Sequence, residues 1–279
     1  MTQEERLRFL LQALLAERPG GQDIAIPRRP GDRRRLLRAL MNTRPPDPIP
    51  PEVLAVQDAF LQAELAEKSI TRLADLTPRQ PGQYLWQGDI TTLAVDAIVN
   101  AANRQMLGCF VPCHGCIDNA IHSAAGMELR QACAQLMARQ GHEEPTGQAK
   151  LTGGYHLKAK HVIHTVGPVY SGKEEDAVLL RRCYWNSLEL ARQNGLHSIA
   201  FPAISTGAYG YPKEEATRIA LKTAFDWMQI NPKYGMRILF ACFDQETTAR
   251  YQSTWNGSQE DWKAQAGQQG QADVVERAI

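Results

Sequence analysis

The sequence predicts an α/β fold, with a largely parallel sheet covered by helices on both faces and an all-helical unit before it. From about residue 83, short runs of β-branched and aromatic residues alternate with helical patterns, an order typical of strands joined by helical crossovers. The first 80 residues have only helical spacing. We therefore expect a helical N-terminal extension over 1–80, an α/β domain over 81–265 and a polar C-terminal tail over 266–279.

The N-terminal extension is expected to contain three helices. Thr2 and Glu5 form a capping box ahead of a leucine-rich stretch that runs to Ala16. A second amphipathic helix contains part of a basic run over 28–38. That run is either an anion or partner site or a solvated helix face. A proline cluster then breaks the chain, and Pro51 can occupy the first turn of a third helix that reaches about Lys68.

The α/β domain is expected to contain six strands with helices between most of them. The predicted strands are 84–87, 97–100, 149–151, 161–166, 199–202 and 238–243, and the predicted helices are 117–139, 177–193, 214–229 and 247–264. Ligands of parallel sheets bind beyond the carboxyl ends of the strands. The residues that follow each strand are therefore the candidates for a site.

Composition bounds the class of protein and its partners. The chain has 279 residues, of which 43% are hydrophobic and 22% charged, as in ordered globular proteins. Thirty-one basic and thirty acidic residues leave a net charge of +1, so no global field favours nucleic acid or a membrane as a partner. No apolar run is long enough to span a bilayer, and the N-terminus lacks the order of a signal peptide. We expect a cytoplasmic protein.

Polar and aromatic residues follow four of the predicted strands. Asp89 follows the first, where a carboxylate forms either a simple turn or an acceptor for an exocyclic amine such as that of adenine. Asn100 and Asn103 end the second strand and flank two small residues. Phe243 follows the last strand, as either a buried core ring or an exposed ring that stacks on a base. After the fifth strand, residues 203–213 are rich in small residues and glycine, which suits either a tight connector or a phosphate cradle of backbone N–H groups.

Three of the six cysteines lie within eight positions of one another and surround a histidine. Cys109, His114 and Cys116 supply two thiolates and an imidazole, a donor set that fits zinc, and three protein ligands leave the open position of a catalytic site. Cys113 is the spare thiol, because adjacent side chains tend to point apart. A redox-reactive thiol loop and a zinc ion that only shapes the loop are the alternatives.

Five stretches, from about residue 84 to 244, together resemble the macrodomain family: QGDIT, VDAIVNAAN, GCIDNAIHSAAG, HVIHTVGP and IAFPAISTGAYGYP. Hydrolytic macrodomains of the ordinary type have a glycine run between the asparagine pair and the following helix. This chain instead has MLGCFVPCHGC, which is similar to the zinc-containing macrodomains, a branch that also carries a helical N-terminal extension. The resemblance implies a three-layer α/β/α fold with a mixed, largely parallel sheet.

The resemblance also implies a function and a set of site residues. It implies an enzyme that binds ADP-ribose and removes mono-ADP-ribose from protein side chains, with Asp/Glu esters as the expected linkage and one Zn²⁺ per chain held by Cys109, His114 and Cys116. Asn103 and Asp118 are the implied catalytic residues, with the alternative that Asp118 only caps its helix. The implied substrate-binding residues are Asp89, Ile90 and Phe243 at the adenine, Ser205, Thr206, Gly207, Ala208, Tyr209 and Gly210 at the diphosphate, and Asn100 and Asn103 at the distal ribose.

Two other functions use the same site. A reader module would bind ADP-ribose without reacting with it, although three metal ligands beside the ribose are superfluous for binding alone. A deacetylase would act on O-acetyl-ADP-ribose. The expected partners are ADP-ribose and a mono-ADP-ribosylated protein.

Overall fold

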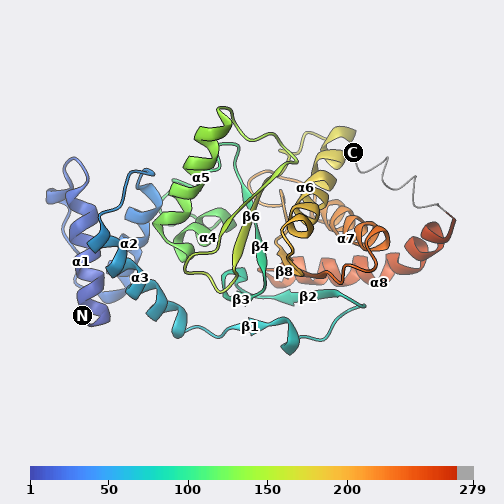
Figure 1. Cartoon of the computed structure of the whole chain (residues 1–279), viewed down its shortest axis with the longest axis horizontal. Coiled ribbons are helices and arrows are strands. Elements are labelled where there is room, and N and C mark those ends of the chain that lie inside the picture. The colour runs from blue at the N-terminus through green and yellow to red at the C-terminus, as the bar shows by residue number, and fades with distance from the viewer. Residues whose placement is uncertain (269–279) are drawn as a thin grey trace.

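The computed structural model describes residues 1–268 and has a six-stranded sheet between two layers of helices (Figure 1). The strand order is β2-β8-β7-β4-β6-β5, and all neighbours are parallel except β5 and β6. The strands are β2 (Gln83–Gln87), β4 (Ala97–Ala102), β5 (Ala149–Gly153), β6 (His161–Val166), β7 (Ser198–Phe201) and β8 (Arg237–Cys242). The predicted three-layer fold with a mixed, largely parallel sheet is confirmed.

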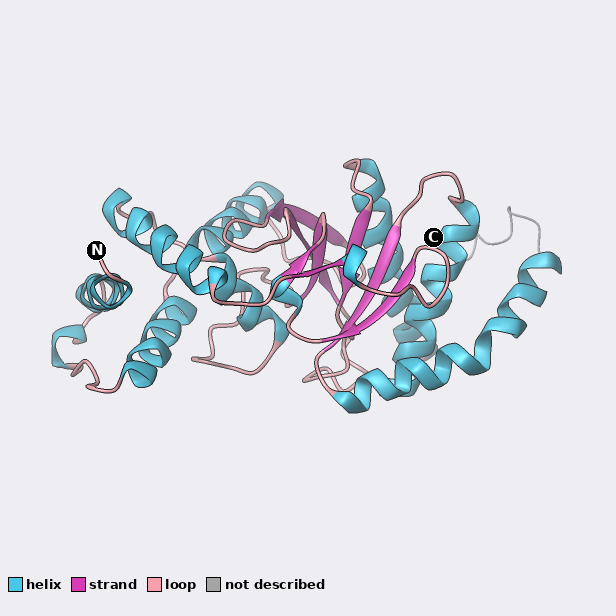
Figure 2. Ribbon diagram, turned by 90° about the horizontal axis from the view of Figure 1, so that it is seen from below, coloured by secondary structure: helices cyan, strands magenta, loops and turns pink. Residues whose placement is uncertain are grey.

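Each face of the sheet has its own hydrophobic core. One core packs the sheet against α6 (Glu174–Gln193), α7 (Lys213–Ile230) and α8 (Gln245–Gln268), and the other packs it against α4 (Ile117–Ala125) and α5 (Met127–Gln140). Side chains alternate between the two cores along β4, where Ile98 belongs to one and Val99 to the other, both fully buried. Seen from below, the strands lie between these helices (Figure 2).

The predicted helix over 117–139 is wrong in one respect, because it is two helices separated at Gly126. Gly126 has φ 96°, a backbone conformation that residues other than glycine rarely adopt. A Cβ there would also lie 2.8 Å from Glu128 Oε2 and 3.0 Å from Gln57 Nε2. The break therefore lets a residue of the extension approach the start of α5. At the other end of the chain, residues 266–268 of the predicted tail belong to α8, and 269–279 lie outside the described residues.

The extension is a bundle of three helices, α1 (Gln3–Ala16), α2 (Pro30–Thr43) and α3 (Pro51–Ala66). The predicted capping box is present, since Thr2 Oγ1 accepts from the Glu5 N–H at 3.2 Å and Glu5 Oε2 accepts from the Thr2 N–H at 2.7 Å. Leucines of α1 and α2 form its core together with Met127 of α5. After α3, the short strand β1 (Thr71–Arg72) pairs with β3 (Leu93–Ala94) of the α/β part.

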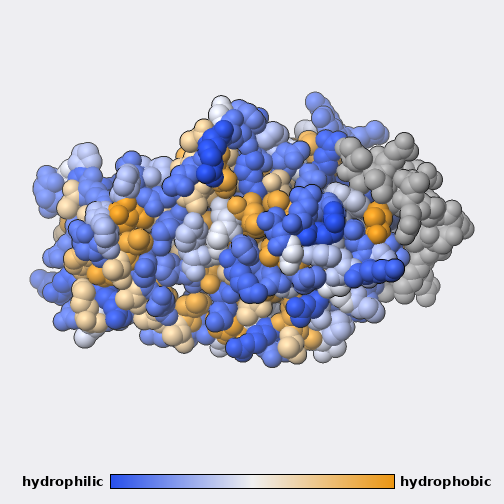
Figure 3. Space-filling view, in the orientation of Figure 1, coloured by the Kyte–Doolittle hydropathy of each residue, from blue (hydrophilic) through white to orange (hydrophobic). Residues whose placement is uncertain are grey.

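The extension docks beside α4 and α5 (Figure 1). Gln57 of α3 accepts from the Met127 N–H at 2.8 Å and donates to Glu128 at 2.7 Å. On the face shown in Figure 3, hydrophobic residues are scattered among hydrophilic ones. Within residues 1–268, no helix combines the length and the hydropathy that crossing a bilayer requires.

Candidate functional site

The candidate residues converge because the strands that carry them are parallel. The carboxyl ends of β2, β4, β6, β7 and β8 lie at one edge of the sheet. Gln87 pairs with Cys242, and the Gly88 N–H donates to the Cys242 carbonyl at 2.9 Å. Asp89 and Phe243, which follow these two strands, are therefore brought together at the edge predicted to bind a ligand.

Asp89 and Phe243 form one end of the site. Asp89 Oδ1 accepts from the Thr91 hydroxyl at 2.7 Å and the Thr91 N–H at 3.0 Å, and Lys68 Nζ lies 3.4 Å from Oδ2. Burial opposes ionisation, but these hydrogen bonds and the Lys68 charge lower the pKa of Asp89, which keeps the carboxylate an acceptor. Ile90 is buried beneath it, and Phe243 is 83% exposed, so the ring is not part of the core.

The loop after β7 presents a row of backbone donors. Ser205 and Gly210 have φ of 65° and 67°, and the turn is closed by bonds from the Gly210 N–H to the Gly207 carbonyl and from the Tyr211 N–H to the Ser205 carbonyl. Between these points, the backbone N–H groups of 205–209 have no hydrogen-bond acceptor among residues 1–268. Free N–H groups in such a turn can bind an anion. The predicted diphosphate-binding residues thus share one loop that has backbone donors to spare.

Cys109, His114 and Cys116 also come together, with their three donor atoms within 4.8 Å of one another. Cys109 Sγ lies 3.6 Å from His114 Nδ1. A tetrahedral zinc ion, with bonds of about 2.3 Å to sulfur and about 2.0 Å to nitrogen, would separate such a pair by about 3.5 Å. The three donors therefore fit zinc in type, and the Cys109–His114 pair also fits it in spacing. Cys113 is turned away, because its thiol donates to the Arg35 carbonyl at 3.3 Å.

Cys116 is also the N-cap of α4, and its Sγ accepts from the Asn119 N–H at 3.4 Å. The alternative that Asp118 is the cap is therefore wrong, since Asp118 lies inside the first turn. Burial raises the pKa of the Cys116 thiol to about 11, and the neighbouring Cys109 adds to this against the opposing Asn119 hydrogen bond. A thiol of this kind ligates a metal only when a cation displaces its proton.

Asp118 lies in the first turn of α4, directly after the loop over 109–116 that carries the metal donors (the metal loop), and is buried. Burial raises the pKa of its carboxyl to about 6, although the Asn100 amide and the Arg130 charge oppose the shift. Asn100 Nδ2 donates to Asp118 Oδ1 at 2.8 Å, and His122 Nε2 lies 3.5 Å from the same oxygen. A carboxyl with a pKa near neutral can accept a proton in catalysis.

The two asparagines of the predicted pair differ in position. Asn100 is fully buried and supports Asp118, so its contact with a distal ribose stays a prediction. Asn103 Oδ1 accepts from the backbone N–H groups of Gln105 and Met106, and its Nδ2 donates to the Gly108 carbonyl at 3.1 Å. Asn103 therefore shapes the turn that leads into Cys109.

Tyr209 lies half-buried in the loop after β7. Burial raises the pKa of its phenol, and the negative charge of Asp118 adds to the shift. Because β7 pairs in parallel with β4, the loop after β7 and the segment that leads from β4 to the metal donors start at the same edge of the sheet.

Several residues that support the site escaped the sequence analysis. They are Arg38, Asn42, Asn119, Arg130 and His164. Arg38 was part of the basic run, but no local pattern distinguished it from its neighbours. Asn119 contacts the loop from the first turn of the next helix, whereas Asn42, Arg130 and His164 contact the site across long sequence separations that no spacing rule reveals.

Comparison with known proteins gives concordant results. A family model described as "Macro domain" matches residues 99–220. A protein of Treponema medium named "Protein-ADP-ribose hydrolase" is 49% identical over 257 residues, covering 90% of this chain and 98% of that protein. A protein of Staphylococcus aureus (strain COL) with the same name is 40% identical over 257 residues, covering 90% and 95%. The solved structure of a Trypanosoma brucei macrodomain in complex with ADP-ribose superposes with a TM-score of 0.61 at 34% identity, covering 77% of this chain and 94% of that one.

Proposed function

This chain belongs to the macro domain family and is a protein-ADP-ribose hydrolase, like the relatives that it matches over nine-tenths of its length, and we propose that its reaction depends on zinc. In this proposal one zinc ion per chain is held by Cys109, His114 and Cys116, and the bond that is hydrolysed joins mono-ADP-ribose to an Asp or Glu side chain of the target protein.

One observation carries the proposal. The three metal donors lie within 4.8 Å of one another on the loop that leads into α4, and the buried carboxyl of Asp118 lies in the first turn of that helix. Both therefore occupy the same end of the site. Asp89 and the exposed ring of Phe243 follow β2 and β8, which β7 separates from β4 in the sheet. With adenine there and the diphosphate on the loop over 205–210, the distal ribose would extend toward Asp118 and the metal donors.

The proposed binding steps use groups that follow the strands at one edge of the sheet. Asp89 would accept the exocyclic amine of adenine, the backbone of Ile90 would lie beside the base, and Phe243 would stack on it. Ser205, Thr206, Gly207, Ala208, Tyr209 and Gly210 would surround the diphosphate with backbone donors. Asn100 and Asn103 would border the distal ribose. This order places the reacting end of the substrate at the metal loop.

The chemical step requires a group that accepts a proton and a group that polarises the reacting atoms. Asp118 would accept the proton of the attacking hydroxyl or water, because burial raises its pKa to about 6 and the Asn100 amide fixes its orientation. Asn103 would keep the metal loop at the ribose through its bond to the Gly108 carbonyl. When bound, zinc would supply a Lewis acid to a ribose hydroxyl or a water. An ester linkage is already activated, so these contributions suffice.

The experiment compares linkages in one assay. Release of labelled ADP-ribose is measured from protein modified on Asp/Glu, from protein modified on serine, and from O-acetyl-ADP-ribose, before and after metal removal. We expect zinc-dependent release from the carboxylate-linked protein. Preferential hydrolysis of O-acetyl-ADP-ribose would assign the site to the small molecule, and preferential release from serine would overturn the proposed linkage.

A further inference from the structure

The loop that carries the metal donors has little structure of its own. Cys109 and Cys116 are only half-buried, and His114 is exposed. Among the described residues, one internal backbone hydrogen bond joins this loop to itself, from the His114 N–H to the Val111 carbonyl at 3.2 Å. Cys113 also has φ 53°, a conformation that is uncommon for residues other than glycine. Such a conformation persists only where the surroundings impose it.

Helix α2 of the extension supplies part of these surroundings through Arg38. Arg38 Nη2 donates to the His114 carbonyl at 3.2 Å and to Asn119 Oδ1 at 2.7 Å. Asn119 in turn donates through Nδ2 to the Val111 carbonyl at 3.0 Å and through its backbone N–H to Cys116 Sγ at 3.4 Å. The Arg38 guanidinium is thus hydrogen-bonded to the backbone of His114 and, through Asn119, is linked to the sulfur of Cys116.

A second residue of α2 holds the middle of the loop. Asn42 is buried, its Oδ1 accepts from the Cys113 N–H at 2.9 Å, and its Nδ2 donates to Ser123 Oγ at 2.9 Å. The Arg35 carbonyl accepts from the Cys113 thiol at 3.3 Å. These bonds account for the strained φ of Cys113 and turn its thiol away from the other donors.

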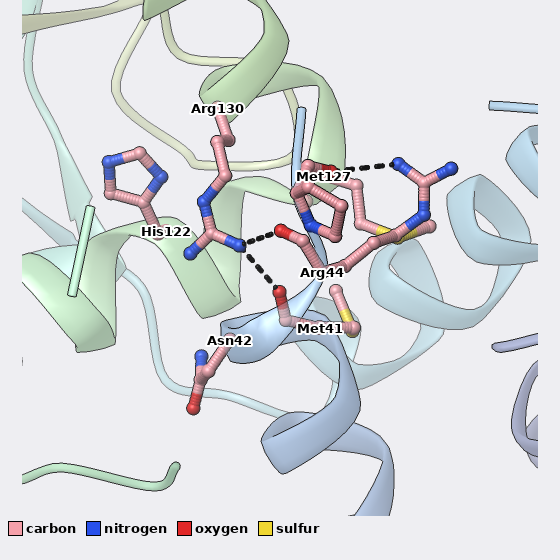
Figure 4. A pocket seen from close by; sticks show the side chains of 8 residues that line it. Met41, Asn42, Arg44, His122, Met127 and Arg130 are labelled. Carbon is pink, nitrogen blue, oxygen red and sulfur yellow. Dashed lines mark hydrogen bonds between the residues drawn. The ribbon is translucent and has the colours of Figure 1, made fainter. Parts of the chain in front are cut away.

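The end of α2 is tied in turn to the segment that enters the loop. The buried Arg130 of α5 donates through Nη1 to the Met41 carbonyl at 3.0 Å and the Arg44 carbonyl at 2.5 Å, as Figure 4 shows. Its Nε donates to the Leu107 carbonyl at 2.7 Å, two residues before Cys109. The guanidinium also lies 4.3 Å from the centre of the Phe110 ring. Both sides of the loop therefore depend on the position of α2.

We propose that α2 of the extension is a working part of the metal site, with Arg38 and Asn42 as positioning residues that hold the loop over 109–116 in the shape that brings its three donors together. This inference rests on the proposed function for the identity of the metal. It also gives Arg38 a role apart from the rest of the basic run, since Arg33 pairs with Glu4 and Arg34 with Glu64.

The test compares Arg38→Met with Arg35→Met in the full-length chain. Arg35 lies on the same helix and is exposed, and its side chain has no hydrogen-bond partner within residues 1–268, so it controls for the loss of one positive charge. Zinc affinity is measured by competition with a chromogenic chelator, alongside ADP-ribose affinity and melting temperature. We expect Arg38→Met to bind zinc about 10- to 100-fold more weakly, as for other residues that orient metal ligands, with ADP-ribose affinity within about twofold of wild type.

A second measurement does not depend on the metal. In metal-free protein, hydrogen exchange of the amides over 110–116 is expected to be about tenfold faster in Arg38→Met than in Arg35→Met, because the loop opens locally once its anchor is removed. Asn42→Ala is likewise expected to speed hydrogen exchange of the Cys113 amide, whose N–H donates to Asn42 Oδ1 in the wild type. If Arg38→Met fails to fold, Arg38→Lys carries the comparison, since lysine keeps the charge but lacks the Nε donor to Asn119 and the planar fork of the guanidinium.

The outcomes separate the two proposals. Equal zinc affinity in Arg38→Met and Arg35→Met overturns the positioning role while leaving zinc in place. If wild-type protein binds no zinc, the proposed function fails, and exchange of the loop amides then decides whether α2 holds the loop.

Discussion

The amide of Asn100 donates a hydrogen bond to Asp118 Oδ1 over 2.8 Å, and both side chains are buried. This contact joins β4 to the first turn of α4, two elements that the chain connects through residues 103–116, which include the metal loop. It fixes the carboxyl that we propose as the proton acceptor.

Asp118→Asn tests that assignment. The amide has the same shape and cannot accept the proton, so turnover is expected to fall by about 100- to 10,000-fold. ADP-ribose affinity should stay within a few-fold of wild type and the melting temperature should not fall, because a buried carboxyl that resists ionisation adds no net stability. Single-turnover release and calorimetry on the same preparation check this. Wild-type turnover in the variant would remove Asp118 from the mechanism.

The choice of metal ligands predicts that Cys116→Ala loses zinc and Cys113→Ala keeps most of it. Cys116 Sγ belongs to the donor group within 4.8 Å, whereas the Cys113 thiol is bonded to the Arg35 carbonyl. Elemental analysis of untagged protein after zinc supplementation measures both, against about one zinc per chain in wild type. Equal loss in the two variants would show that the ligand set is wrong.

Gly207→Glu is expected to abolish measurable ADP-ribose binding without unfolding the protein. No atom lies within 4 Å of a Cβ built at Gly207, so the protein tolerates the side chain, but its negative charge would occupy the proposed diphosphate position. Gly31→Glu adds the same side chain in equally open space on α2 and is the matched control. Unchanged affinity in Gly207→Glu would exclude this loop from the site.

Asp89→Ala is expected to weaken ADP-ribose binding by about 1–3 kcal/mol, the usual loss for a charged hydrogen-bond partner. Thr91 and Lys68 hold the carboxylate in place before ligand arrives. Calorimetry with Glu67→Ala as the control measures the effect, since Glu67 is an exposed carboxylate at the end of α3. An equal effect in both variants would mean that Asp89 acts only through net charge.

The burial of His164 predicts how the free energy of unfolding depends on pH. It is fully buried, and burial lowers the pKa of its imidazole to about 3. The unfolded chain, with a histidine pKa near 6.5, therefore takes up a proton more readily than the folded chain. Stability contributed by neutral His164 is complete above pH 6.5 and declines as the pH falls toward 3, by about 3 kcal/mol at pH 4.

Urea unfolding of metal-free protein between pH 4 and pH 7.5 measures this decline. Metal-free protein is needed because zinc release at low pH would add to the slope. His164→Gln should flatten the curve, and the exposed His197→Gln should not. Parallel curves for His164→Gln and wild type would show that His164 does not carry the acid sensitivity.

Periodicity was enough to predict the sheet and the helices on both of its faces, and the strand ends identified the edge of the sheet at which the candidate residues lie. Cys109, His114 and Cys116 lie within eight positions, so their meeting could be read from local spacing. The break at Gly126 could not, because its cause is the approach of Gln57 from a helix about seventy residues earlier. The contact of Arg38 with Asn119 was hidden for the same reason, since arginine on an amphipathic helix is typical of a solvated face.

The most direct test of the account is turnover of metal-free protein that is still folded. Zinc is removed with a chelator, folding is checked by circular dichroism and melting temperature, and ADP-ribose affinity and release from a carboxylate-modified protein are measured before and after zinc is restored. The account predicts affinity within a few-fold of the zinc-bound protein and turnover lower by about 100-fold or more, recovered with one equivalent of zinc. Turnover at the zinc-bound rate by folded, metal-free protein would contradict it.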